Sequence, residues 1–115
     1  MAKKQKEIRV VIKNVAEAPF VKTIPNELEE FQKIVGGYIE VVPYNPKPMA
    51  KEITTLANEE GKVEGLEPNL ILLPYDIVVG NVFFTRTDFS TGEFVTLTDT
   101  DIEQIAEAYG WKINQ

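Results

Sequence analysis

The stretch NEEGKVEGLEPN, residues 58 to 69, holds the residues whose types and spacing could do chemistry. An EF-hand calcium loop binds its ion with side-chain oxygens placed around one sharply turning glycine. With Gly61 at that central position, oxygen donors fall at Asn58, Glu60, Glu64 and Glu67. Leu56 then occupies the first position, where a carboxylate is required, and the flanking ITTLA and LILLPY segments are strand-like. We therefore assign no metal ligands and interpret residues 58–61 as a hairpin loop, with Gly61 supplying a positive φ.

The same segment could instead present hydrogen-bonding groups to a ligand from a rigid loop. Turn chemistry accounts for Asn58 and Gly61, but it does not require the neighbouring glutamates. Three interpretations of these glutamates are open: solvated charges, ligand contacts or weak cation ligands. Arg86 lies between two threonines on a predicted strand, where its guanidinium could bind a phosphate or a carboxylate. The candidate ligand-binding residues are Asn58, Glu59, Glu60, Lys62, Asn69 and Arg86.

The composition restricts the chemistry further, because the chain contains no histidine and no cysteine. Thiol nucleophiles, disulfides, imidazole bases and nearly all zinc sites are thereby excluded. Catalysis would have to use carboxylates, lysine or hydroxyl groups, and no set of them is arranged as a known catalytic motif. We assign no catalytic residues and no cofactor, and we favour a non-enzymatic role over an enzyme. A small nucleotide-handling or carboxylate-based enzyme is the alternative.

The charge balance bears on the partners. Lys and Arg number 12 against 18 Asp and Glu, for a net charge of -6, which argues against nucleic-acid binding. Acidic residues concentrate in two predicted helices, at Glu27, Glu29 and Glu30 and at Asp99, Asp101, Glu103 and Glu107. Such a surface could imitate DNA in the basic groove of another protein. Acidic first turns also complement the helix dipole, so an acidic DNA-mimic inhibitor is a second alternative.

The length of 115 residues fits one domain. We expect a flexible basic tail over residues 1–6 and a single domain over residues 7–115. The apolar runs are too short to span a bilayer and the N-terminus has no signal-peptide pattern, so we expect a cytoplasmic protein without membrane contact.

The first half of the chain alternates strands with one helix. Residues 7–13 have the period of a strand, and Val11 interrupts the alternation as if both faces were covered. Residues 20–25 form a second strand ending at Pro25, which cannot donate to a central ladder. Asn26 is predicted to cap a helix of about ten residues, with Glu29 at the capping-box position. The Gly36-Gly37 pair ends that helix rather than forming a phosphate loop, and residues 38–44 form a strand.

The second half is richer in strands. We predict strands over 53–57 and 62–64 around the hairpin loop, further strands within 70–88 with a bulge or close approach at Gly80, and a hairpin returning through 93–97. Thr98 and Asp101 should cap a final helix whose residues Ile102, Ile105, Ala106 and Tyr109 face inward, with Trp111 folding back onto the core. The fold class is α+β: a mainly antiparallel curved sheet of five or six strands with two helices packed against it. Exposed edge strands would allow a homodimer.

Four blocks of the sequence together resemble one family of small domains: TIPNELEEFQKIVGGYIEVVPY, NEEGKVEGLEPN, DIVVGNVFF and LTDTDIEQI. The chain is similar, from Ile8 to Ile105, to domain of unknown function 3846. Family members often carry a Pro-Pro-Asn-Arg run where this chain has Glu67-Pro68-Asn69-Leu70, so no role of that arginine is transferred. The resemblance implies a phage, prophage or mobile-element setting. We therefore expect a binding or interaction module acting on a host protein or a small ligand, for example in interference with host defence.

Overall fold

The structure is a computed structural model that describes residues 4–72 and 76–115. Its elements follow one another as β1 (Glu7–Lys13), β2 (Phe20–Pro25), α1 (Leu28–Val35), β3 (Ile39–Val42), β4 (Ile53–Asn58), β5 (Pro68–Leu72), β6 (Asp76–Val79), β7 (Val82–Asp88), β8 (Glu93–Val95) and α2 (Asp99–Tyr109). Of the segment LILLPY, residues 73–75 lie outside the described part of the chain. The tail expected over residues 1–6 lies in part outside the described residues. Within the described part, the backbone carbonyls of Gln5 and Lys6 accept hydrogen bonds from Asn26.

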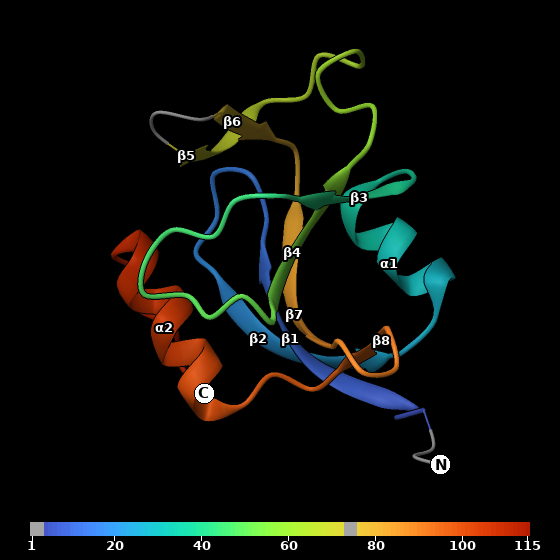
Figure 1. The fold of residues 1–115 in the computed structure, drawn as a ribbon. Coiled ribbons are helices and arrows are strands. Elements are labelled where there is room, and N and C mark those ends of the chain that lie inside the picture. The colour runs from blue at the N-terminus through green and yellow to red at the C-terminus, as the bar shows by residue number, and fades with distance from the viewer. Residues whose placement is uncertain (1–3, 73–75) are drawn as a thin grey trace.

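The main sheet has six antiparallel strands in the order β2-β1-β7-β4-β3, with β8 paired to β7. Strand β7 is the centre of the sheet (Figure 1). One of its edges pairs with β4, and the other pairs first with β1 and then with β8. Strands β5 and β6 form a separate antiparallel hairpin. The predicted α+β class, with two helices and a mainly antiparallel sheet, is confirmed.

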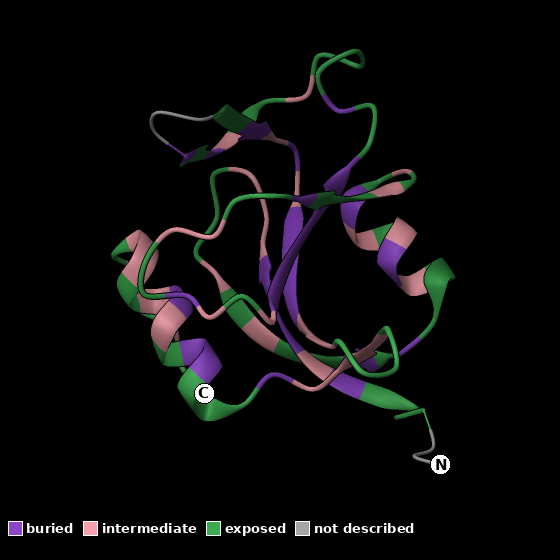
Figure 2. Cartoon of the chain, in the orientation of Figure 1, coloured by how far each residue is buried: buried purple, intermediate pink, exposed green. Residues whose placement is uncertain are grey.

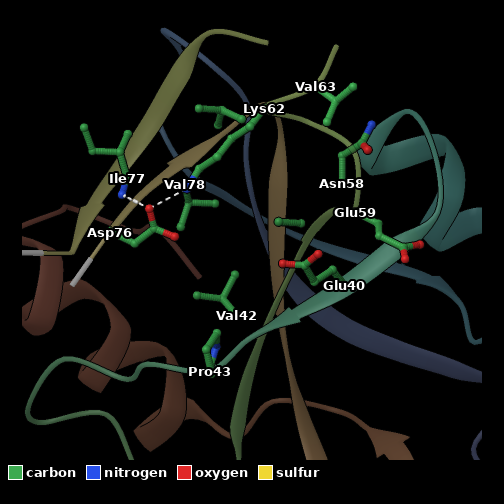
Figure 3. A pocket seen from close by; sticks show the side chains of 12 residues that line it. Glu40, Val42, Pro43, Asn58, Glu59, Lys62, Val63, Asp76, Ile77 and Val78 are labelled. Carbon is green, nitrogen blue, oxygen red and sulfur yellow. Dashed lines mark hydrogen bonds and ion pairs between the residues drawn. The ribbon is translucent and has the colours of Figure 1, made fainter. Parts of the chain in front are cut away.

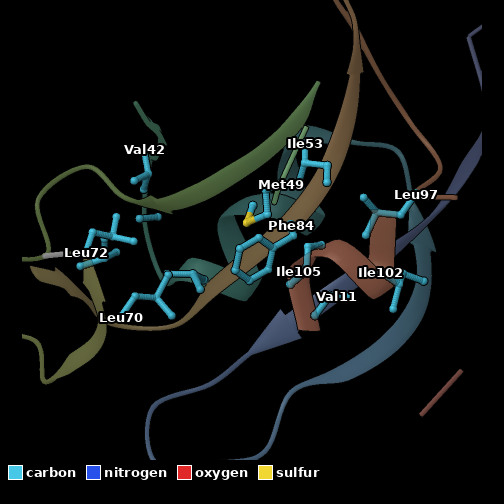
Figure 4. Packing of buried hydrophobic residues seen from close by; sticks show 13 residues of the cluster. Val11, Val42, Met49, Ile53, Leu70, Leu72, Phe84, Leu97, Ile102 and Ile105 are labelled. Carbon is cyan, nitrogen blue, oxygen red and sulfur yellow. The ribbon is translucent and has the colours of Figure 1, made fainter. Parts of the chain in front are cut away.

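The two faces of the main sheet bury separate cores (Figure 2). On β1, Val10 and its neighbours at alternate positions pack with α1, whereas Val11 packs with α2 on the opposite face. The expectation that β1 is covered on both faces is therefore confirmed. The β5–β6 hairpin covers the same face as α2, and Figure 4 shows Leu70 extending toward Phe84 in that core, with Leu72 beyond it.

The two helix starts show one correct and one wrong prediction. The hydroxyl of Thr98 accepts a hydrogen bond from the backbone N–H of Asp101, and the Asp101 carboxylate accepts one from the Thr98 N–H, which completes the predicted capping box of α2. Helix α1 instead begins after Glu27, without a side-chain cap, and spans 8 residues. The predicted cap, Asn26, is buried and donates its side-chain amide to the carbonyls of Gln5 and Phe94. The side chain of Asn26, which the local pattern assigned to the helix cap, therefore makes tertiary hydrogen bonds instead.

The segment after β4 also differs from the prediction. Residues 59–65 form successive turns, so residues 62–64 are not a return strand. Strand β4 pairs with β3 and β7 instead. Gly61 is not among the described glycines with positive φ. A Cβ on Gly61 would lie 2.9 Å from a methyl group of Val79, so the glycine permits close packing against β6.

Other predicted turns and ends are confirmed. Gly36 ends α1 in the left-handed conformation with φ 78°, and Trp111 packs its ring on Phe84. Gly80 combines a φ of 79° with a close approach to Leu66. Pro25 lies on β2, which is an edge strand as its missing N–H requires.

Candidate functional site: an acidic cleft between β3 and β6

A cleft of about 130 Å³ lies where β3 and the end of β4 face the edge of β6 (Figure 3). The turns after β4 close one end of it. The lining residues are Glu40, Val42, Pro43, Ala57, Asn58, Glu59, Lys62, Val63, Asp76, Ile77, Val78 and Val79. Small-molecule sites usually enclose about 300–1,000 Å³, so this cleft suits a group of the size of one side chain.

The carboxylates of the cleft come from the alternation of the strands. Ile39 and Val41 point to the α1 face of the sheet, so Glu40 and Val42 project from the opposite face into the cleft. Glu40 lies opposite Ala57, and the ladder continues as the Glu59 N–H donates to the Tyr38 carbonyl over 2.8 Å. Diagonal neighbours on one face lie about 7 Å apart, so the two glutamates flank one space.

Asn58 holds the turn that carries Glu59. Its buried side-chain amide donates to the carbonyl of Val35 at the end of α1, and its side-chain oxygen accepts from the Glu60 N–H at 2.8 Å. Gly37 makes room for this side chain, since a Cβ there would lie 2.8 Å from the Asn58 amide nitrogen. Asn58 is thus a positioning residue that ties the turn to α1.

The opposite wall is fixed by an ion pair. Lys62 Nζ lies 2.5 Å from the Asp76 carboxylate, which also accepts a hydrogen bond from the Ile77 N–H. These hydrogen bonds, first the one from Lys62, hold the pKa of Asp76 below its usual range. Because Lys62 is engaged in this way, it does not neutralise the other carboxylates of the cleft. Glu40 and Glu59 form no ion pair with any residue that the structure describes.

Three of the sequence candidates, Asn58, Glu59 and Lys62, come together in this cleft, and the other three lie elsewhere. Glu60 is exposed and is not part of the lining. Asn69 bridges two segments by donating to the carbonyls of Lys13 and Gly80. Arg86 donates to the buried Asp101 carboxylate over 2.8 Å.

Arg86 is also far from the cleft. It pairs with Ile53 at the opposite end of β4 from Asn58, which is about 17 Å away at about 3.4 Å per residue. Nucleotide or anion chemistry that combines Arg86 with Lys62 therefore has no common site.

The sequence reasoning missed Glu40 and Asp76. Both lie in segments correctly recognised as strands, but outside residues 58–69, on which the search for a site concentrated. A weak signal was present, because Glu40 is a charged residue on a strand whose next inward position is apolar Val42.

Metal chemistry finds no support in the geometry. Within residues 4–72 and 76–115, no group of three or more acidic side chains is arranged to hold a metal ion. The helices of that part of the chain include none long and apolar enough to cross a membrane.

The fold and the cleft define a small α+β domain with a helix on each face of an antiparallel sheet and an acidic cleft of the size of a side chain. The family model described as a domain of unknown function (DUF3846) matches residues 8–110. The chain therefore belongs to that family, as its sequence blocks suggested. No curated protein and no solved structure matches it.

Proposed function

We propose that this protein is a non-catalytic binding module that recognises a cationic group, carried by a host protein or a small ligand, in the cleft between β3 and β6. The observation that carries this proposal is that two carboxylates of the cleft, Glu40 and Glu59, form no ion pair with any described residue, while Lys62 is paired with Asp76. Their apolar surroundings, among them Val42 and Val78, suit the methylene stem of a lysine or arginine.

The size and charge of the cleft favour this role over the two alternatives. A nucleotide needs more volume than about 130 Å³ and an anion site, whereas this cleft is acidic. A DNA mimic needs one continuous acidic surface, but α1 and α2 cover opposite faces of the sheet (Figure 1). On α2, moreover, Asp99 and Asp101 are each paired with an arginine.

The test is a titration followed by backbone amide shifts in NMR spectra. N-acetyl-lysine N-methylamide should shift the amides of residues 40 and 59 in a saturable way, whereas the uncharged N-acetyl-norleucine N-methylamide should not. Glu40→Gln and Glu59→Gln should each weaken the lysine probe at least threefold. Glu103→Gln, an exposed position on α2, is the matched control. Equal shifts by both probes, or no shift by the lysine probe, would overturn the proposal.

A further inference from the structure

Strand β3 leaves one edge of the main sheet open. It is the last strand in the sheet order and, among residues 4–72 and 76–115, pairs only with β4. In an antiparallel ladder, residues exchange hydrogen bonds with the neighbouring strand at alternate positions. The bond from the Glu59 N–H to the Tyr38 carbonyl makes 38, 40 and 42 the positions that bond to β4. Ile39 and Val41 therefore direct their N–H and C=O groups away from the sheet.

Those outward groups have no backbone partner in the described part of the chain. The other edge strand of the main sheet, β2, differs in this respect. There Lys22 and Pro25 oppose pairing with another strand, because a charge and a missing N–H both discourage it. Strand β3, with the sequence IEVV, carries neither lysine nor proline.

From this edge and the cleft beside it we infer that the partner is an extended peptide segment, which adds to the sheet as a strand next to β3. The inference rests on the proposed function and names its ligand. An added strand places side chains alternately on the two faces of the sheet. On the cleft face they meet Glu40, and on the α1 face they meet Val41, which is 56% exposed. The segment should therefore alternate basic with apolar residues.

Charge selects this partner over a second copy of the chain. In a β3–β3 homodimer, the added strand would bring its own Glu40 toward a cleft that already holds Glu40 and Glu59. Like charges facing each other across strands are destabilising. The net charge of -6 adds long-range repulsion between two copies. A lysine or arginine in the added strand instead lies next to the Glu40 carboxylate and points toward Glu59.

The experiment uses the peptide acetyl-Val-Lys-Val-Lys-Val-Lys-amide and two N-methylated forms of it. One form is methylated at the valine nitrogens and the other at the lysine nitrogens. Only one of these sets of N–H groups can face β3, so one form should bind at least tenfold more weakly and the other within about twofold of the parent. Equal binding of both forms would overturn strand addition. If the lysine probe still bound in that case, the proposed cleft function would stand alone.

Two variants of the protein test the same edge. Val41→Pro removes an outward N–H without removing a bond to β4, so it should weaken the peptide at least fivefold while leaving the lysine probe unaffected. Val41→Thr keeps the N–H and is the matched control. A melting temperature within a few degrees of the wild type checks that each variant is folded. Unchanged peptide affinity in folded Val41→Pro, or dimerisation of the wild type through β3 in sedimentation, would overturn the inference.

Discussion

At the residue scale, the cleft depends on a buried side chain that anchors its wall. Asn58 is buried and joins the end of α1 to the turn after β4. Its amide occupies the space beside Gly37, so each of the two positions limits the size of the side chain that the other can carry. The shape of the acidic wall therefore depends on a contact between Gly37, just after the end of α1, and Asn58, at the end of β4.

Gly37→Ala should lower the free energy of unfolding by about 1–3 kcal/mol, because the new methyl group overlaps the Asn58 amide. Gly37 does not have a positive φ, so backbone strain does not contribute to this cost. The same substitution should cost much less in an Asn58→Ala background, where the overlapping group is gone. Urea unfolding of the four proteins of this double-mutant cycle measures the difference. Additive costs would contradict the contact.

Tyr109 provides a pH-dependent prediction. Burial raises its pKa from 10.0 to about 12, and its hydroxyl has no hydrogen-bond partner within the residues described. Below pH 10 the phenol is neutral in both states, so its contribution to stability is complete. Between pH 10 and 12 the unfolded chain loses this proton first, which favours unfolding, so stability falls as pH rises.

Tyr109→Phe should therefore match or exceed the wild type in stability at pH 7, because it removes an unsatisfied buried hydroxyl. It should also lose less stability than the wild type between pH 9 and pH 11. Urea unfolding at the three pH values checks both points. An identical pH dependence of the two proteins would show that Tyr109 titrates normally.

At the element scale, the sequence predicted what short-range chemistry determines. The capping box of α2, the glycine ends of both helices and the double-faced strand β1 all depend on residues within a few positions of one another. Strand pairing and side-chain use across the fold depend on distant partners. Asn26 was assigned to a helix cap because its tertiary bonds to Gln5 and Phe94 are invisible in the local pattern.

For the same reason, the sequence predicted only some of the residues that line the cleft. Asn58, Glu59 and Lys62 are close in sequence and could be proposed together, but Glu40 and Asp76 reach the cleft only through the pairing of β3 with β4 and the placement of the β5–β6 hairpin. The predicted strand at 62–64 would have put Lys62 in a ladder. The turns observed over residues 59–65 instead place the Lys62 ammonium next to the Asp76 carboxylate.

The two helix starts lead to a paired prediction. Glu27 has the extended backbone of a capping residue, with φ -139° and ψ 142°, but its side chain makes no cap. Glu27→Asp should stabilise the protein by about 0.5–1 kcal/mol, because a shorter carboxylate can accept from the first turn of α1. Thr98→Ala should destabilise it by about 1 kcal/mol by removing the cap of α2. Thermal unfolding checks both, and destabilisation by Glu27→Asp would show that the longer side chain has another role.

At the scale of the whole molecule, charge and topology act together. Among the described residues, β3 is open on the side where Glu40 and Glu59 have no ion-pair partner, and the net charge of -6 opposes the approach of a second copy of the chain. In the proposed complex, the whole molecule would attract a basic peptide from a distance, and Glu40 and backbone bonds would hold it at close range. These two contributions respond differently to salt, because screening acts most strongly on exposed charges separated by about 10 Å or more at 0.1 M.

Raising NaCl from 50 to 500 mM should therefore lower the association rate of the Val-Lys peptide about tenfold and change its dissociation rate less than threefold. Stopped-flow measurement with a fluorescently labelled peptide separates the two rates. Glu40→Gln should raise the dissociation rate at every salt concentration, since it removes a contact made only in the complex. Glu103→Gln removes the same charge from α2 and should change only the association rate, and only slightly. A salt effect confined to dissociation would mean that long-range attraction has no part in binding, and that the acidic balance of the chain serves solubility alone.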